Sequence, residues 1–429
     1  MLEDFTTLEL DNGLKLLLKD IHTAPLISTW IWYGVGSRYE SPGKTGISHW
    51  VEHMQFKGTP HFPSQVLDRT ISRLGGTWNA FTHMDWTTYF ETLPVNAFEI
   101  ALELESDRMV NSLYNPKEVE LERTVVIAER EGAENSPLFL LDEAVQLAAF
   151  DQHPYRYEVT GQKEDLYRIS RDDLYQHYRT YYQPANATIC ISGDFDTAEM
   201  VTKVRQYFEN IPAKPVPELE LPQGTFLKEE KRLDISGPGE TTYIQIAYPS
   251  PKADSADFFA LSILDSLLTG PSGLNMFGSG AVGQKTSWMY QALVEKELAV
   301  SVHGSLQATV DPFIYSISLT LHPQRSVEVL LQASDEQIDQ LQEHLISDDE
   351  ILRAVKQAKA LFAYGSENIT NQAFWMGYAS AFASYDWFRF YIDNLAAITP
   401  ADVQRVAQTY LAHENRVVGI YHPTNAGEV

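Results

Sequence analysis

Along the first half of the chain, some segments have hydrophobic residues at the spacing typical of strands, and others have them at the spacing typical of helices. Residues 8–19, with a turn at residues 12–13, and residues 26–34 show the strand pattern, and residues 76–92 predict a further strand because they are rich in Thr, Trp, Tyr and Phe. Helices are expected over five segments, residues 46–57, 64–74, 95–112, 116–132 and 137–150. Runs of helices between a few strands predict an α+β fold, with helices packed on one face of a mainly antiparallel sheet.

The end of this half is repeated at the end of the chain. Residues 169–193 align with residues 398–422 at an offset of 229 positions. Each copy predicts a helix that starts with a capping box and is followed by an apolar strand. The capping pairs are Ser170 with Asp173 in the first copy and Thr399 with Asp402 in the second. We therefore expect two duplicated halves of the same fold.

A proline-rich stretch separates the two halves. Residues 211–224 contain four prolines, which remove backbone donors and stiffen the chain, so this segment predicts an extended linker. We expect an N-terminal domain over residues 1–212, a linker over residues 213–224 and a homologous C-terminal domain over residues 225–429.

The composition narrows the class of protein. Hydrophobic residues make up 44% of the chain and charged residues 21%, which is typical of a globular protein. The net charge of −26 argues against a nucleic-acid partner, which needs basic patches to neutralise phosphate. The acidity either marks only a solvated surface or, if it reaches a cleft, favours basic or neutral ligands. The single cysteine, Cys190, excludes an intrachain disulfide and lies in an apolar run that predicts a buried strand.

Two features bear on where the protein is found. No apolar run approaches the roughly 18 residues that a membrane span needs. The first residues, MLEDFTTLELDNG, are acidic and lack the pattern of a signal peptide. We expect a cytoplasmic protein without a membrane span, and a periplasmic location stays open if an upstream signal was removed.

The strongest candidate for chemistry is the segment GISHWVEHMQFK, residues 46–57. His49 and His53 are four residues apart, so on a helix their Cβ atoms share one face at roughly 5–6 Å and both imidazoles can bind one metal ion. Glu52 lies near the same face and can reach a metal-bound water without being a ligand. This order, H-x-x-E-H, is the inverse of the zincin motif. A helix with two incidental histidines beside a solvated glutamate is the alternative.

A catalytic zinc site of this kind needs a third protein ligand. Residues 115–137 place Glu122 and Glu129 seven residues apart, two helical turns, on one stripe of the expected helix. Val125 and Val126 lie between them and are expected to help bury that face. On periodicity alone, an amphipathic helix with solvated carboxylates explains the pattern better.

Taken together, these segments resemble the pitrilysin, insulinase and mitochondrial processing peptidase family of zinc peptidases over nearly the whole chain. Beside H-x-x-E-H, the resemblance rests on GVGSRYE before the motif, EHMQFKGT through it and GGTWNAFT after it. Glu129 stands 76 residues after His53, the spacing of the family's third zinc ligand. Glu122, seven residues earlier, resembles the glutamate that assists catalysis in the family.

The resemblance implies a zinc-dependent endopeptidase that acts on peptides with one Zn²⁺ per chain. His49, His53 and Glu129 would bind the zinc and leave one position for water. Glu52 would take a proton from this water as it attacks the scissile carbonyl and would return it to the leaving amine.

The resemblance also implies where a peptide binds. Asn79, Ala80, Phe81 and Thr82 resemble the family's substrate-binding edge strand. An extended peptide could pair with the backbone of this strand by β-augmentation, a mode that binds many sequences. A plain packed edge strand is the alternative.

The second half departs from the family. It contains no H-x-x-E-H, and Val300 stands where active members have a tyrosine, with Val294 or Leu293 where they have an arginine. Valine cannot donate a hydrogen bond to an oxyanion. We therefore expect a heterodimer in which a homologous subunit supplies the arginine–tyrosine pair, and a homodimer stays open. The alternatives are a non-catalytic peptide-binding or core subunit of a complex, and a domain in which zinc is only structural.

Overall fold

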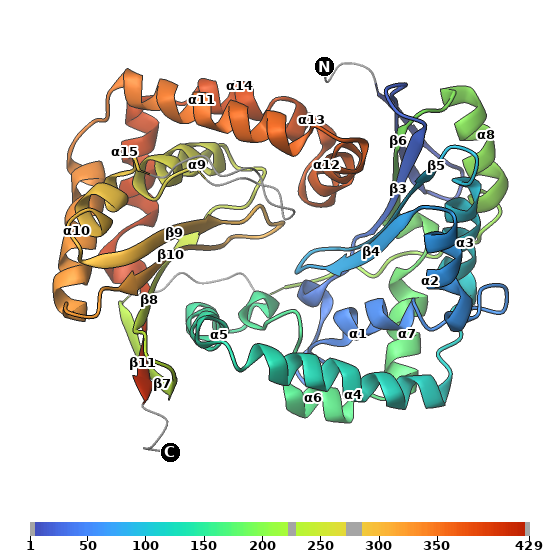
Figure 1. The fold of residues 1–429 in the computed structure, drawn as a ribbon, viewed down its shortest axis with the longest axis horizontal. Helices are drawn as coiled ribbons and strands as arrows, with labels where there is room; N and C mark the ends of the chain where they lie inside the picture. The colour runs from blue at the N-terminus through green and yellow to red at the C-terminus, as the bar shows by residue number, and fades with distance from the viewer. Residues whose placement is uncertain (1–4, 222–228, 272–284, 425–429) are drawn as a thin grey trace. The chain divides into compact units, whose positions relative to one another are not determined.

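The computed structural model describes residues 5–221, 229–271 and 285–424 (Figure 1). The chain forms two compact units, and each unit is assembled from three segments of the sequence. Unit 1 contains Met1–Glu131, Tyr157–Leu221 and Ser366–Phe388, and unit 2 contains Gly132–Arg156, Pro222–Gly365 and Arg389–Val429. The linker expected over residues 213–224 stays a prediction, because part of it lies outside the described residues.

Unit 1 is built on a six-stranded sheet with the strand order β1-β2-β6-β3-β5-β4. Neighbouring strands are antiparallel, except that β2 and β6 are parallel. The strands are β1 (Thr6–Glu9), β2 (Lys15–Asp20), β3 (Leu26–Tyr33), β4 (Thr77–Thr82), β5 (Thr87–Pro94) and β6 (Ala187–Gly193).

One face of this sheet packs on helices and forms the core of unit 1. Ile27, Ile31 and Tyr33 of β3 belong to this core and are almost completely buried. α1 and α2 contact β4, α3 contacts β3, and α8 contacts β2. The helices of unit 1 that lie in the first half of the sequence are α1 (Ile47–Met54), α2 (Ser64–Arg73), α3 (Glu99–Asn111), α4 (Pro116–Ala133), α6 (Lys163–Arg168), α7 (Arg171–Tyr181) and α8 (Thr197–Phe208).

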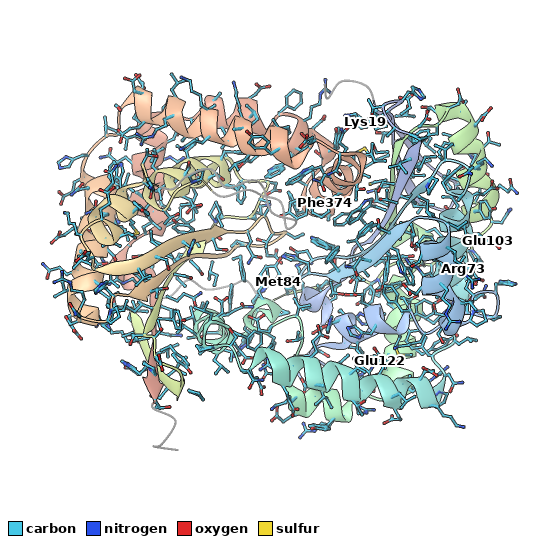
Figure 2. The ribbon with its side chains drawn as sticks, viewed as in Figure 1. Lys19, Arg73, Met84, Glu103, Glu122 and Phe374 are labelled. Atoms are coloured by element: carbon cyan, nitrogen blue, oxygen red, sulfur yellow. The ribbon has the colours of Figure 1, made fainter. Side chains whose placement is uncertain are left out.

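The opposite face of the sheet is covered by a helix from the second half of the sequence. α12 (Ile369–Phe382) contacts β3 and β6, and the short α13 (Tyr385–Arg389) follows it. Trp30 and Trp32 of β3 have ring centroids 5.3 and 5.4 Å from that of Phe374 on α12, which Figure 2 labels. A Cβ atom at Gly377 would overlap the Trp32 indole, so this close approach requires glycine. β3 is therefore buried on both faces, which explains its nearly continuous apolar sequence.

Unit 2 is built on a five-stranded sheet with the order β7-β11-β8-β10-β9, in which only β7 and β11 are parallel. Its strands are β7 (Lys231–Pro238), β8 (Tyr243–Ser250), β9 (Ala299–Leu306), β10 (Phe313–Leu321) and β11 (Val417–Thr424). Its helices are α5 (Pro137–Ala149), α9 (Ala256–Leu268), α10 (Val327–Glu343), α11 (Asp348–Gly365), α14 (Tyr391–Ala396) and α15 (Pro400–Tyr410). The α+β class with two duplicated halves, which the sequence predicts, is confirmed.

Unit 2 also receives a helix from the other half of the sequence. α5, which comes from the first half, contacts β7, β8 and β11. Leu141 and Val145 of α5 lie so close to Gly419 of β11 that a Cβ atom there would overlap the Val145 side chain. Each sheet is therefore covered in part by a helix from the other half of the chain.

The repeated segments fold alike in the two units. In α7, Ser170 accepts a hydrogen bond from the backbone of Asp173 and the Asp173 side chain accepts one in return, and Thr399 and Asp402 form the same box at α15. The strand after each helix takes the same place, because β6 lies between β2 and β3 and β11 lies between β7 and β8. The capping boxes and the helix–strand repeat expected from the sequence are confirmed.

The single strand expected over residues 76–92 is wrong. This segment forms a hairpin, in which Thr82 at the end of β4 pairs with Thr87 at the start of β5. His83 and Met84 in the turn accept backbone hydrogen bonds from Ser37 and Arg38, and Figure 2 labels Met84. The turn is closed by a hydrogen bond of 2.8 Å from the N–H of His83 to the carbonyl of Trp86 and is held in addition by these contacts with a distant segment.

Two further observations complete the fold. Cys190 lies on β6 and is fully buried, as its apolar surroundings in the sequence predict. Among the described residues, none of the helices combines the length and the apolar character needed to cross a membrane.

Candidate metal centre

The two histidines of the H-x-x-E-H segment lie one turn apart on α1. Their Nε2 atoms are 3.3 Å apart, and the His49 and His53 side chains are 14% and 20% exposed. Burial, and then the neighbouring His53, lower the pKa of His49 to about 3. The imidazole of His49 is therefore neutral at physiological pH and has a lone pair to offer a metal.

Glu129 of α4 reaches the same point from a second helix. Its Oε2 atom lies 3.8 Å from Nε2 of His49 and 3.5 Å from Nε2 of His53. Tetrahedral zinc with bonds of about 2.0–2.2 Å to nitrogen and oxygen places its ligand atoms roughly 3.3–3.5 Å apart. Two of the three separations lie within this range and the third is 3.8 Å, so the three atoms form a group that could hold a metal ion, and the half-exposed Glu129 leaves one side of it accessible.

The start of α1 is fixed by buried carboxylates. Glu40 accepts hydrogen bonds from the backbone N–H groups of Gly46 at 2.7 Å and Ser48 at 2.8 Å. Asp165 accepts bonds from the backbone N–H and the hydroxyl of Thr45 at 3.1 and 2.7 Å. Gly46 has a φ of 83°, a conformation that favours glycine, so the helix begins at a defined residue. These contacts set the direction in which α1 presents its histidines.

Glu122 lies behind His53 on the buried side of α4. Its side chain is 6% exposed, and its Oε1 atom lies 2.8 Å from Nδ1 of His53. Burial tends to raise the pKa of Glu122, but hydrogen bonds from His53 and Lys57 outweigh it and lower the pKa below its usual value. Because an ionised carboxylate only accepts hydrogen bonds, Nδ1 of His53 carries the proton and Nε2 is left for a metal.

Glu52 is held by the edge strand β4. The Thr82 hydroxyl donates a hydrogen bond of 2.7 Å to Oε2 of Glu52. Burial raises the pKa of Glu52 above its usual value, and the bond from Thr82 only partly offsets this effect. The hydrogen bond from Thr82 fixes one oxygen of Glu52 and leaves the other to accept and release a proton.

The predicted peptide-binding residues all lie on β4, at the edge of the sheet. Among the described strands, β4 pairs only with β5. Asn79 is exposed and Ala80 is buried, and the Asn79 side chain accepts the backbone N–H of Ala80 at 3.0 Å. Phe81 and Thr82 are half-buried. On β4, the backbone N–H of Ala80 therefore donates to the side chain of Asn79 and not to a further strand.

Of the two valines on α4 that were expected to help bury the face with Glu122, one is buried and the other is exposed. Val126 is 2% exposed and helps to bury the face with Glu122, but Val125 is 46% exposed and does not. Val125 lies one position before Val126, and a step of about 100° around the helix turns its side chain to solvent.

Two side-chain contacts at the candidate site were not predicted from the sequence. Lys57 makes an ion pair with Glu122, and the Thr82 side chain binds Glu52. The EHMQFKGT segment includes Lys57, but nothing in its spacing indicated which carboxylate it meets. In unit 2, Val300 on β9 is 55% exposed, Val294 is half-buried and Leu293 is fully buried.

Two family models match the chain one after the other. The model described as Insulinase (Peptidase family M16) matches residues 15–163, and the model described as Peptidase M16 inactive domain matches residues 168–358. The first match contains His49, Glu52, His53, Glu122 and Glu129, and the second contains Val300.

Several curated relatives are similar along most of their length. An uncharacterized zinc protease of Streptomyces coelicolor is 25% identical over 94% of this chain and 86% of its own, and the zinc protease PqqE of Helicobacter pylori is 27% identical over 94% and 89%. A probable mitochondrial-processing peptidase subunit beta of Arabidopsis thaliana is 26% identical over 68% of this chain and 55% of its own.

Solved structures share the fold at low sequence identity. The crystal structure of a protease from Helicobacter pylori has a TM-score of 0.89 at 24% identity and covers 99% of this chain and 100% of that one. A peptidase M16 inactive domain from Pseudomonas fluorescens has a TM-score of 0.87 at 16% identity and covers 98% of both chains.

Proposed function

The chain belongs to the M16 family of peptidases, which includes insulinase, and from this premise we propose that it is a zinc-dependent endopeptidase that hydrolyses peptides. The observation that supports this most is the convergence of Nε2 of His49, Nε2 of His53 and Oε2 of Glu129, with mutual distances of 3.3–3.8 Å. Three protein ligands with an open side are typical of catalytic zinc sites, whereas structural sites usually have four.

Each residue of the site has a distinct part in this proposal. When bound, zinc supplies Lewis-acid chemistry that polarises a carbonyl and favours a water nucleophile at neutral pH. Glu52 accepts a proton from the attacking water on the oxygen that Thr82 leaves free and returns it to the leaving amine. Glu122 keeps the proton of His53 on Nδ1 and thereby positions the ring.

We propose that substrates bind in extended form along β4. A peptide that adds to the outer edge of this strand would take over the backbone N–H of Ala80, which the Asn79 side chain accepts at 3.0 Å. This mode reads the peptide backbone, so it favours broad peptide binding. Thr82, at the end of the strand, would bring the peptide next to Glu52, because its hydroxyl contacts that carboxylate.

A partner subunit belongs to the same proposal. The exposed Val300 offers no hydrogen-bond donor where active members of the family have a tyrosine. We propose that a homologous subunit supplies an arginine–tyrosine pair that stabilises the oxyanion. The second candidate function is a non-catalytic subunit of a complex, and the match of residues 168–358 to a domain described as inactive favours it.

A peptide-cleavage assay combined with a metal count tests these proposals. The chain should contain about one zinc, lose cleavage with a chelator and regain it with zinc. Without a homologous subunit that has the arginine–tyrosine pair, cleavage should be about 10²–10³-fold slower, the usual effect of a missing oxyanion donor. A zinc-loaded mixture that cleaves no extended peptide would favour the non-catalytic subunit. Equal rates with and without the partner would refute the heterodimer.

A further inference from the structure

Lys57 makes a contact that the proposed chemistry does not use. It follows α1 in the chain, and its Nζ atom forms an ion pair with Oε2 of Glu122. The other oxygen of the same carboxylate, Oε1, lies 2.8 Å from Nδ1 of His53. Glu122 is 6% exposed and Lys57 is 28% exposed, so the ion pair is shielded from water on the Glu122 side. Each oxygen of Glu122 thus has its own partner.

We propose that Lys57 is a positioning residue of the metal centre, which holds Oε2 of Glu122 so that Oε1 faces His53 and Nε2 of His53 points toward the metal. The inference rests on the proposed role of His53 as a zinc ligand. It adds a residue that touches neither the metal nor the peptide and acts only through Glu122.

The positions of the three residues on two helices explain why Glu122 needs a second contact. His53 and Lys57 lie on or just after α1, whereas Glu122 projects from α4, so the carboxylate must be oriented across two helices. A glutamate side chain has several rotatable bonds, and fixing it for one hydrogen bond costs conformational entropy. A second, charge-assisted contact on the other oxygen selects the orientation in which both bonds form at once.

Removal of Lys57 should change zinc affinity in the direction opposite to that expected from the charge of Lys57 alone. Lys57 is a cation near a cation site, so if it acted only through its charge, its removal would strengthen zinc binding. If Lys57 positions Glu122, its removal weakens zinc binding, because partners behind a ligating histidine typically contribute 10–100-fold to metal affinity. The direction of the change therefore separates the two roles.

Zinc affinity, measured without any peptide by competition with a chromophoric chelator, tests the inference. Lys57→Met and Lys57→Gln should each bind zinc about tenfold more weakly than the wild-type chain. Lys57→Arg, which keeps a cation on Glu122, should retain most of the affinity. Lys163→Met is the matched control, because it removes the same charge from an ion pair with Glu131, also on α4, at 3.9 Å. This control should leave zinc affinity unchanged.

A double-mutant cycle shows whether Lys57 acts through Glu122. In a Glu122→Gln background, Lys57→Met should weaken zinc binding no further, because the partner that it positions is already lost. Unchanged or tighter zinc binding by Lys57→Met, or additive losses in the double variant, would overturn the inference. If the chain binds zinc but cleaves no peptide, the proposed peptidase activity fails, and the role of Lys57 can still be tested by zinc affinity. If the wild-type chain binds no zinc, both the metal centre and the positioning role of Lys57 are refuted.

Discussion

The hydroxyl group of Thr82 donates a hydrogen bond of 2.7 Å to Oε2 of Glu52, and this contact joins the edge strand β4 to the helix α1. The strand proposed to bind the peptide backbone therefore also holds the proposed base. Movement of β4 on peptide binding would move the carboxylate with it, so the positions of substrate and base are linked by a single side chain.

Replacement of Thr82 by valine should slow cleavage without loss of zinc. Valine has nearly the same shape but cannot donate to Glu52, and a hydrogen bond to a charged group contributes about 1.5–3 kcal/mol. We expect kcat to fall about tenfold or more with little change in KM, measured in steady-state assays with zinc content determined in parallel. Thr82→Ser should restore most of the rate. Thr77→Val, at the exposed start of the same strand, is the control.

Replacement of Glu52 by glutamine should abolish turnover and leave the metal in place. Glutamine is isosteric but cannot accept the proton, and general-base catalysis contributes about 10²–10⁴-fold. Zinc content and cleavage rate of Glu52→Gln are the measurements. Cleavage at the wild-type rate would show that another group activates the water.

The carboxyl group of Glu40 should make stability depend on pH. Burial raises its pKa from 4.5 to about 7, against hydrogen bonds from the backbone of Ser48 and Gly46. Since the folded pKa lies above the unfolded one, the contribution to stability is fully present below pH 4.5 and is lost as the pH rises through about 7. The loss amounts to about 3 kcal/mol.

A comparison of unfolding free energies between wild type and Glu40→Gln isolates this effect. The variant cannot titrate at this position, so its stability relative to wild type should rise between pH 4.5 and pH 7. A difference that stays constant over this range would show that Glu40 does not titrate there. The part of the difference in unfolding free energy that does not change with pH measures the effect of replacing an oxygen of Glu40 that accepts a backbone N–H group.

His177 should produce the opposite slope at lower pH. Burial, and then the charge of Lys44, lower its pKa from 6.5 to about 3. The contribution of the neutral imidazole is therefore present above pH 6.5 and lost as the pH falls toward 3. In Glu40→Gln this acid-side loss should become steeper than in the wild-type chain, because the compensating gain from Glu40 is gone. Urea unfolding at several pH values measures both slopes.

Two helical glycines should respond to alanine in opposite directions. A Cβ atom at Gly377 overlaps the Trp32 indole, so Gly377→Ala should destabilise the protein by about 1–3 kcal/mol. Gly132 near the end of α4 has no atom within 4 Å of the added Cβ, so Gly132→Ala should stabilise it by about 0.5–1 kcal/mol. Urea unfolding monitored by tryptophan fluorescence gives both values. Equal effects would contradict the packing of α12 on β3.

The sequence predicts those features of the fold that depend on near neighbours. The capping boxes at Ser170 and Thr399 are visible because cap and partner are three residues apart. His49 and His53 share a helical face for the same reason. The hairpin turn at residues 83–86 was not predicted because its central residues, Met84 and Asp85, are not one of the glycine-containing pairs that signal a tight hairpin turn, although a local bond from the N–H of His83 to the carbonyl of Trp86 closes it.

Long-range contacts also limit what the sequence reveals about the site. Glu129 could not be separated from solvated carboxylates by helical periodicity, and only its spacing from His53 singled it out. The contacts of Lys57 with Glu122 and of Thr82 with Glu52 join separate elements, so no local pattern indicates them. For the same reason the exchange of α5 and α12 between the two units was not foreseen.

The exchange of α12 affects how the protein is made on the ribosome. The six strands of unit 1 are complete once Gly193 has emerged, but α12, which covers Trp30 and Trp32, ends only at Phe382. At a translation rate of roughly 5–20 residues per second, the face of the nascent sheet with Trp30 and Trp32 stays uncovered for about 10–40 s before α12 has been synthesised. During this interval the growing polypeptide exposes an apolar surface that chaperones can bind, and unit 1 is completed only when a late helix docks onto an early sheet.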